Sequence, residues 1–250
     1  MRIRRKKWAR PELAKCSYYI SDAASMKGKW KTAFSNADNP VYAEFGCGKG
    51  HFAAESAYRY PDINWLAFDI KSEMLAVARR NVENFFADKE KKHDNLLLVS
   101  HNISLISNVF AENERIDRKY INFCNPWPRG KHQKRRLTHP RQLIQYREFL
   151  ADGGEIRFKT DDDDLFEDSL VYFEECGFSI VKKTYDLHND SECMEENIMT
   201  EHERMFSGEG KKIKFLIAVK DKPLPEEAVK KYIKGEKEFE QDSGISKGEL

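Results

Sequence analysis

The chain has 250 residues and an almost balanced charge, with 43 lysines and arginines against 42 acids, and its 40% of hydrophobic residues is enough for a sizeable core. No apolar run approaches the ~20 residues of a membrane span, and the basic start of the chain lacks the apolar stretch of a signal peptide. Five cysteines without a CxxC pair argue against a disulfide framework or a zinc ribbon and favour reduced thiols in a cytoplasm.

Short apolar runs alternate with helical patterns along most of the chain. Strands are predicted at 41–45, 64–70, 96–100, 119–124, 153–160, 178–184 and 212–219. Helices are predicted at 51–60, 72–86, 138–150 and 165–176, with Ser72 as a cap of the second and Gly177 as the end of the last. This alternation predicts an α/β fold with a mostly parallel sheet and helices on both faces. By analogy of fold, seven strands ending in a widely separated pair suit a Rossmann-like methyltransferase sheet with one reversed strand.

The two ends of the chain differ from its middle in charge. Residues 1–10 carry six lysines or arginines and no acid, so we interpret about 1–30 as the basic arm of a single domain that covers 1–220. Residues 221–250 mix both signs and contain few apolar residues, which predicts a charged tail with at most a surface helix. The four consecutive acids at 161–164 are more typical of a helix start than of a metal site, and we expect no metal.

A glycine-rich segment, EFGCGKG at 44–50, lies between the first predicted strand and the first predicted helix. Gly46, Gly48 and Gly50 would let the backbone turn sharply and let a ligand approach the N-terminus of the helix. Such a triplet alone is weak, because a tight turn without a ligand has the same pattern.

Two acids and an amide make the ligand more specific. Asp69 ends the second strand, where a carboxylate can accept hydrogen bonds from both ribose hydroxyls of a nucleoside. Glu44 would repel a pyrophosphate but attract the ammonium and sulfonium groups of S-adenosylmethionine, so it favours this methyl donor over a dinucleotide. Asn102 follows the third strand and can both donate to and accept from an adenine edge.

The stretch NPWPRGKHQKRRLTHP at 125–140 gathers five lysines or arginines and no acid behind a stiff corner. It follows the fourth strand, and ligands of α/β sheets bind outside the carboxyl ends of the strands, so Asn125 would lie where the methyl group meets its acceptor. Trp127 could stack on a base or pack beneath the corner. We interpret the basic residues of 129–136 as phosphate contacts, with a solvated charge run as the alternative.

Four separated segments resemble one known family, the bacterial tRNA (guanine-N7-)-methyltransferases. They are EFGCGKG (44–50), NFCNPWPRGKHQKRRLTHP (122–140), GGEIRFKTD (153–161) and TEHERMFSGEG (200–210). The resemblance covers roughly residues 1–219. It implies a cytoplasmic enzyme, monomeric or homodimeric, that transfers a methyl group from S-adenosylmethionine to N7 of a guanosine in the variable loop of tRNA.

The resemblance also implies the site residues. S-adenosylmethionine would be bound by Glu44, Gly46, Gly48, Gly50, Asp69, Asn102 and Asn125, and Asn125 would also be catalytic. The substrate would be held by Arg129, Asp161, Thr200, Glu201, His202 and Glu203. The family usually has an acid in place of Asn125 and of Asn102, a lysine in place of Arg129 and a glutamate in place of Asp69.

The implied chemistry needs little from the protein beyond placement. Guanine N7 has a free lone pair and no proton to lose, so positioning and electrostatics would suffice. Asp161 could accept from N1–H and the exocyclic amine and so select guanine over adenine. Two alternatives stay open: a catalytically weak RNA-binding protein with a methyltransferase fold, suggested by the neutral Asn102 and Asn125, and a small-molecule methyltransferase, which would leave the basic loop unexplained.

Overall fold

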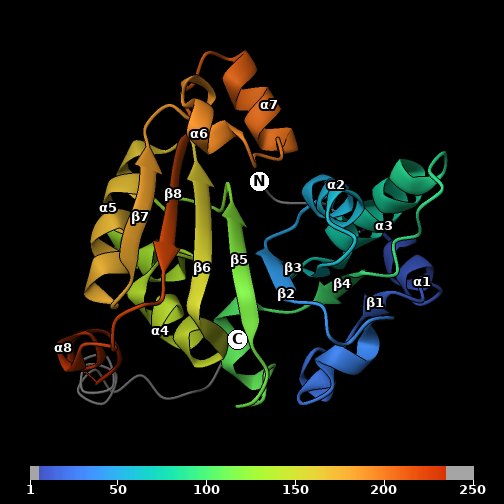
Figure 1. Cartoon of the computed structure of the whole chain (residues 1–250), viewed down its shortest axis with the longest axis horizontal. Coiled ribbons are helices and arrows are strands. Elements are labelled where there is room, and N and C mark those ends of the chain that lie inside the picture. Colours follow the sequence, from blue (N-terminus) through green and yellow to red (C-terminus); the bar gives the residue numbers. More distant parts are fainter. Residues whose placement is uncertain (1–5, 235–250) are drawn as a thin grey trace.

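A mixed sheet forms the centre of the molecule in the computed structural model, which describes residues 6–234 (Figure 1). Its strands are β1 (Tyr19–Ile20), β2 (Val41–Phe45), β3 (Asn64–Asp69), β4 (Leu96–Ser100), β5 (Ile116–Asn122), β6 (Leu150–Thr160), β7 (Ser179–Thr184) and β8 (Lys214–Val219). Their spatial order is β1-β4-β3-β2-β5-β6-β8-β7, and only β8 runs antiparallel to its neighbours. The predicted sheet with one reversed strand is confirmed, but within residues 6–234 it has eight strands instead of seven. The added strand, β1, has two residues, too few to produce a periodic pattern.

Helices cover both faces of this sheet. The longer ones are α2 (His51–Arg59), α3 (Ser72–Phe86), α4 (Pro140–Phe149) and α5 (Asp163–Glu175), and the short ones are α1 (Ala9–Leu13), α6 (Ser191–Met194), α7 (Glu201–Gly208) and α8 (Glu226–Val229). In Figure 1, α4 and α5 lie behind β5, β6, β8 and β7, whereas α2 and α3 lie on the side of β2, β3 and β4. The helix α7 lies above the ends of β5 and β6, the edge to which the parallel strands point.

The boundaries follow local chemistry, with some departures from the sequence prediction. Gly177 has φ +73° and ends α5, as predicted, and Asp162 caps its start by accepting from the N–H of Leu165 at 2.7 Å. Ser72 is the first residue of α3 rather than its cap. The strand β5 ends at Asn122 and not at residue 124, because Phe123 has φ 51° and turns the chain out of the sheet.

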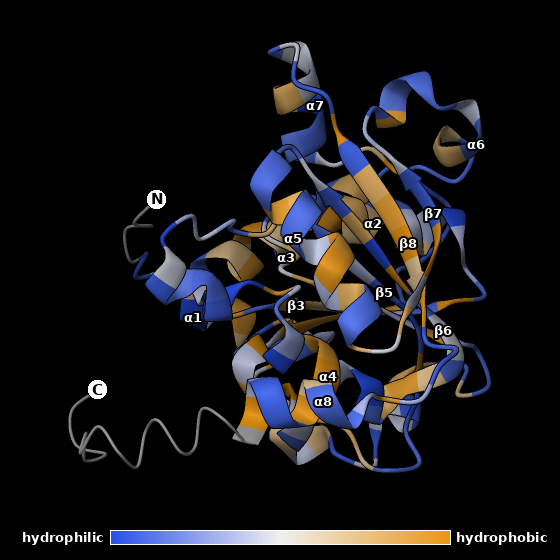
Figure 2. Cartoon of the chain, turned by 90° about the vertical axis from the view of Figure 1, so that its left-hand side faces the viewer, coloured by the Kyte–Doolittle hydropathy of each residue, from blue (hydrophilic) through white to orange (hydrophobic). Residues whose placement is uncertain are grey.

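The core lies between the sheet and the helices and is rich in aromatic rings. Figure 2 shows that β8 is mostly hydrophobic, while hydrophilic residues lie on α5 and α8. Trp30 belongs to this core although it falls at the end of the predicted arm: its side chain is 2% exposed and its Nε1 donates to the carbonyl of Val109 at 2.9 Å. The carboxylate of Glu114 accepts from the N–H groups of Gly28 and Trp30 at 2.8 and 2.9 Å, so this segment is anchored to the sheet domain.

Parts of both predicted end segments contact the domain. Glu12 in α1 accepts from Nε of Arg80 in α3 at 2.7 Å, and Lys231 forms an ion pair of 2.9 Å with Glu175 of α5. Residues 1–5 of the arm and 235–250 of the tail lie outside the described residues. All five cysteines are free thiols. No helix within residues 6–234 has the length and apolar character needed to cross a membrane.

Candidate functional site

The glycine loop leaves β2 at the carboxyl edge of the sheet and leads into α2. Its three glycines have positive φ values of 88°, 54° and 74°, a region that side chains rarely adopt. A Cβ on Gly50 would lie 2.7 Å from the Cβ of Ala78, so close packing of α3 also requires glycine there. The sequence therefore folds here into a bare loop of backbone beside the N-terminus of α2.

Asp69 lies at the end of β3 and is tied to this loop. Its Oδ2 accepts from the N–H of Gly48 at 3.1 Å and its Oδ1 from the N–H of Lys71 at 2.8 Å. Burial raises the pKa of Asp69, although the hydrogen bonds from the backbone act in the opposite direction. These two bonds fix the carboxylate next to the glycine loop.

Glu44, the next-to-last residue of β2, is the most unusual acid at this edge. Its side chain is buried, and Oε1 accepts from Nδ2 of Asn122 at 3.0 Å. Its Oε2 has no hydrogen-bond partner among residues 6–234. Burial raises the pKa of Glu44 to about 7, while the hydrogen bond from Asn122 and the charge of Lys159 oppose that rise. A buried carboxylate oxygen without a donor suits a cationic ligand that would supply one.

Two apolar side chains are exposed at the same edge, and the sequence analysis did not single them out. Ile70 follows Asp69 and is 58% exposed, and Leu105, in the 3-10 helix after β4, is 53% exposed. Asn102 caps that 3-10 helix, because its Oδ1 accepts from the N–H of Ser104 at 3.1 Å. Exposed apolar surface beside a fixed carboxylate is suited to a flat ring such as adenine.

Hydrogen bonds stabilise the corner after β5, and one of them involves the side chain of Asn125. Trp127 has φ 43°, and its N–H donates to Oδ1 of Asn125 at 3.0 Å. The Nε of Arg136 donates to the carbonyl of Pro126 at 2.6 Å. Because its Oδ1 is taken, Asn125 presents its Nδ2 amide to the surroundings; the side chain is exposed.

The basic run after this corner does not act as a unit, which corrects one sequence interpretation. Arg136 is 1% exposed and forms an ion pair with Asp168, so it stabilises the corner and is not available to a phosphate. Arg129 and Arg135 are exposed. The guanidinium of Arg135 lies 5.3 Å from the ring of Trp127, so this ring packs against its own loop.

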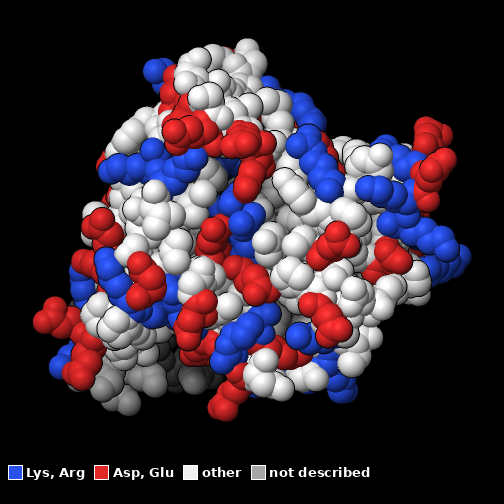
Figure 3. Space-filling model, in the orientation of Figure 1, with Lys and Arg blue, Asp and Glu red and all other residues white. Residues whose placement is uncertain are grey.

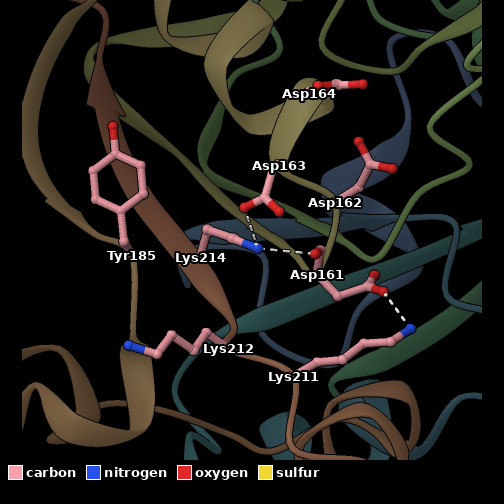
Figure 4. Close-up of a pocket in the computed structure, with 8 residues that line it drawn as sticks. All are labelled: Asp161, Asp162, Asp163, Asp164, Tyr185, Lys211, Lys212 and Lys214. Atoms are coloured by element: carbon pink, nitrogen blue, oxygen red, sulfur yellow. Dashed lines mark hydrogen bonds and ion pairs between the residues drawn. The ribbon is translucent and has the colours of Figure 1, made fainter.

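Asp161, which directly follows β6, lines an open pocket of about 650 Å³ (Figure 4). The other lining residues are Asp162, Asp163, Asp164, Tyr185, Lys211, Lys212 and Lys214. Oδ2 of Asp161 lies 3.1 Å from Nζ of Lys211, and its carbonyl accepts from Nζ of Lys214 at 2.9 Å. Figure 4 shows Lys214 reaching Asp163 as well, while Asp162 and Asp164 point away from the lysines. The carboxylate of Asp161 is therefore already paired with a cation from the segment after α7.

The first turn of α7 lies at the same edge of the sheet as the glycine loop and the corner after β5. Thr200 caps the helix and forms a capping box with Glu203, whose side chain is fully buried. Glu201 forms an ion pair of 2.6 Å with Lys49 of the glycine loop. The ring of His202 stacks near that of Phe123, with 6.2 Å between centroids. Thus α7 contacts both the glycine loop and the corner after β5.

The predicted residues fall into three groups in space. The glycine loop, Glu44 and Asp69 lie together, and Asn102 lies at the same edge. Asn125 follows β5, the strand next to β2, and the ring of Phe123 at the start of this corner stacks near that of His202 in α7. Asp161 lies in its own pocket beyond β6. Within residues 6–234, no group of three or more His, Cys, Asp or Glu side chains is arranged to hold a metal ion.

Charges on the face shown in Figure 3 are mixed. Lysine and arginine side chains there are interspersed with aspartates and glutamates over both halves of the molecule. Electrostatic attraction of a polyanion on this face would therefore depend on individual basic groups rather than on one continuous field.

Comparisons with known proteins agree with this geometry. A family model described as "Putative methyltransferase" matches residues 38–216. A tRNA (guanine-N(7)-)-methyltransferase of Clostridium perfringens is 56% identical over 220 residues, which cover 88% of this chain and 100% of that relative. One from Ruminiclostridium cellulolyticum is 54% identical over 87% of this chain and 92% of its own. The crystal structure of a 16S rRNA methyltransferase superposes with a TM-score of 0.54 at 14% identity, over 82% of this chain and 95% of that one, which is a likeness of fold.

Proposed function

Since the chain belongs to the tRNA (guanine-N(7)-)-methyltransferase family, we propose that it transfers the methyl group of S-adenosylmethionine to N7 of a guanosine in the variable loop of tRNA. The observation that carries the proposal is Glu44: a buried carboxylate with one unpartnered oxygen beside a bare glycine loop. An ammonium group would complete this carboxylate, and a pyrophosphate would be repelled. The proposal includes action in the cytoplasm as a monomer or homodimer.

S-adenosylmethionine would be held by residues at the carboxyl ends of β2, β3 and β4 and in the loops that follow these strands. Glu44 would bind the ammonium of the methionine part, and Asp69 would accept from the ribose hydroxyls. The backbone of the glycine loop would pass close to the ligand. The adenine ring would lie against Ile70, with Asn102 near its edge.

The corner after β5 would place the acceptor base. Guanine presents N7 and O6 side by side, and both are hydrogen-bond acceptors. The free Nδ2 of Asn125 can donate to O6, which leaves the lone pair of N7 free. N7 then forms a bond to the methyl carbon while the carbon–sulfur bond breaks and its electron pair stays on sulfur, giving S-adenosylhomocysteine. No proton leaves the base, so Asn125 serves by orientation.

The remaining edge of the guanine and the rest of the tRNA would contact the segments around this corner. Asp161 would accept from N1–H and the exocyclic amine of guanine if Lys211 yields its carboxylate, and Arg129 would meet a phosphate. Glu201 and His202, at the first turn of α7, would face the substrate. The side chains of Thr200 and Glu203 form the capping box of that turn. In this proposal they therefore act on the substrate indirectly, by holding α7 in position.

The test is a methylation assay on the full chain with a tRNA transcript and S-adenosylmethionine labelled in its methyl group. Nucleoside analysis should show label in N7-methylguanosine of the variable loop. Binding of tRNA without label in this nucleoside would favour the RNA-binding alternative. Activity should also fall steeply with salt, because phosphate contacts release counterions; methylation that ignores salt would favour a small-molecule substrate.

A further inference from the structure

Lys159 is a buried lysine between the two halves of the site. It lies on β6, is 4% exposed and pairs in register with Asn122 of β5, so both side chains lie on the same face of the sheet. Asn122 donates to Glu44 on the donor side. The carbonyl of Lys159 accepts from the N–H of Phe123 at 2.9 Å, at the start of the corner that holds Asn125. The proposed donor site, the corner after β5 and α7 therefore meet around Lys159.

The ammonium of Lys159 is fully used inside the protein. Its three donors reach Oε2 of Glu203 at 2.7 Å, Oδ1 of Asn197 at 2.8 Å and the carbonyl of Ile198 at 2.9 Å. Asn197 and Ile198 belong to the segment that leads into α7, and Glu203 lies in the first turn of α7 itself. The lysine thus fixes the path of the chain just before the helix that covers the site.

Glu203 is equally saturated. Its Oε2 also accepts from the N–H of Thr200 at 3.3 Å, and its Oε1 lies 2.8 Å from Nδ2 of Asn197 and 3.0 Å from Nε2 of His188. Burial alone would raise the pKa of Glu203, but the Lys159 ammonium and the neighbouring donors outweigh it and hold that pKa below its usual value. Four groups of the protein therefore surround this carboxylate.

We propose that Lys159 is a positioning residue that couples the two halves of the site: its ion pair with Glu203 holds α7 against the sheet, and its charge supports the carboxylate of Glu44. The inference rests on the proposed function, because it takes Glu44 as the group that meets the ammonium of the methyl donor. In this arrangement Lys159 acts through Glu203 and Glu44.

The consequence is a defined pH dependence of donor binding. Asn122 from β5, Lys159 from β6 and Asp69 from β3 act on Glu44, and Lys159 is the cation among them. The pKa of Glu44 is about 7, so donor affinity should rise as the pH rises through about 7 and Glu44 becomes ionised. Removal of the Lys159 charge would raise this pKa further and move the rise in affinity to higher pH.

The experiment measures S-adenosylhomocysteine binding by calorimetry between pH 6 and pH 9 for the full chain and for Lys159→Met. We expect the midpoint of the pH dependence to move upward by about half a unit or more, and the Kd at pH 7 to rise about two- to tenfold. The matched control is Lys220→Met, which removes an ion pair of 2.9 Å with Asp152 at the opposite end of β8. That variant should keep the midpoint of the unmodified protein.

A second variant covers the case in which Lys159→Met does not fold. The double variant Lys159→Met/Glu203→Met removes the whole buried pair, which commonly leaves stability unchanged or higher than that of a broken pair. It should show the same upward shift. An unchanged midpoint in whichever of the two variants folds would overturn the inference, because a purely structural lysine would alter stability without moving the midpoint. If the unmodified protein binds no S-adenosylhomocysteine, the donor site itself is wrong, which is a different result.

Discussion

Two buried glutamates near the same edge of the sheet have opposite surroundings. In the proposed donor site, Glu44 has one hydrogen-bonded oxygen and one without a partner among residues 6–234, and its pKa is raised to about 7. Under α7, Glu203 accepts from four donors, and its pKa is held below the usual value. An unsatisfied buried polar group costs stability and persists where a ligand completes it, whereas a satisfied one stabilises the fold. The surroundings of Glu44 therefore suit completion by a ligand, as the proposed donor site requires, whereas the hydrogen bonds that anchor α7 are complete within the protein.

The largest effect on stability is expected for Glu203, the glutamate whose hydrogen bonds are complete. Glu203→Gln should lower the free energy of unfolding by about 3–5 kcal/mol, because it leaves the buried Lys159 ammonium without a counter-charge. Urea unfolding measures this. Glu201→Gln is a matched control two residues away, where the ion pair with Lys49 is exposed, and it should cost less than about 1 kcal/mol. Equal losses in the two variants would contradict the contrast.

Replacement of Glu44 is expected to raise stability instead of lowering it. Glu44→Gln should weaken S-adenosylhomocysteine binding about 10- to 100-fold and yet raise the free energy of unfolding at pH 8 by roughly 1–2 kcal/mol. The sign follows from the folded pKa of about 7, which lies above the reference value of 4.5. The folded state therefore disfavours the ionised acid, and stability is lost as the pH rises from 4.5 to about 7.

Calorimetry and urea unfolding at pH 5 and pH 8 check both parts of this prediction. The gain in stability of Glu44→Gln over the unmodified protein should be larger at pH 8 than at pH 5. A variant that loses stability equally at both pH values would show that Glu44 is an anchor like Glu203.

The residues of the proposed donor site could be singled out from the sequence more readily than those of the segment under α7. The glycine loop and Asp69 are readable because each is local: a turn of glycines, and an acid at a strand end. Lys159 and Asn122 were missed as members of the site, because only the pairing of β5 with β6 places them side by side. Nothing in their own neighbourhoods signals burial.

The basic run shows the same limit. Arg136 looks like its neighbours in sequence, and only the fold turns it inward onto the carbonyl of Pro126. Its interpretation as a phosphate contact was therefore wrong, while the exposure of Arg129 and Arg135 is compatible with it. Pattern alone assigns a charge to a segment, and packing decides which members of the segment face the solvent.

A smaller effect is expected at the cap of α7. Thr200→Ala should lower the free energy of unfolding by about 1 kcal/mol, because its Oγ1 accepts from the N–H of Glu203 at 3.1 Å. Thr200→Ser keeps the hydroxyl and should recover most of this loss. Thermal unfolding of both variants separates the two, and a Thr200→Ser variant as unstable as Thr200→Ala would show that the methyl group, not the cap, is what matters.

The smallest effect is expected at the exposed ion pair that joins the glycine loop to α7. Lys49 and Glu201 lie 2.6 Å apart, but their side chains are 45% and 44% exposed, so water and salt screen the pair. Lys49→Met should change the free energy of unfolding by less than about 0.5 kcal/mol and the Kd for S-adenosylhomocysteine by less than about threefold. A loss of donor affinity as large as that of Lys159→Met would mean that the surface pair, and not the buried one, connects α7 to the donor pocket. Attraction between charges exposed to water is weak, whereas a buried pair with complete hydrogen bonding is not easily replaced by contacts with water. The buried pair of Lys159 and Glu203 should therefore contribute more to the connection between α7 and the proposed donor site than the exposed pair.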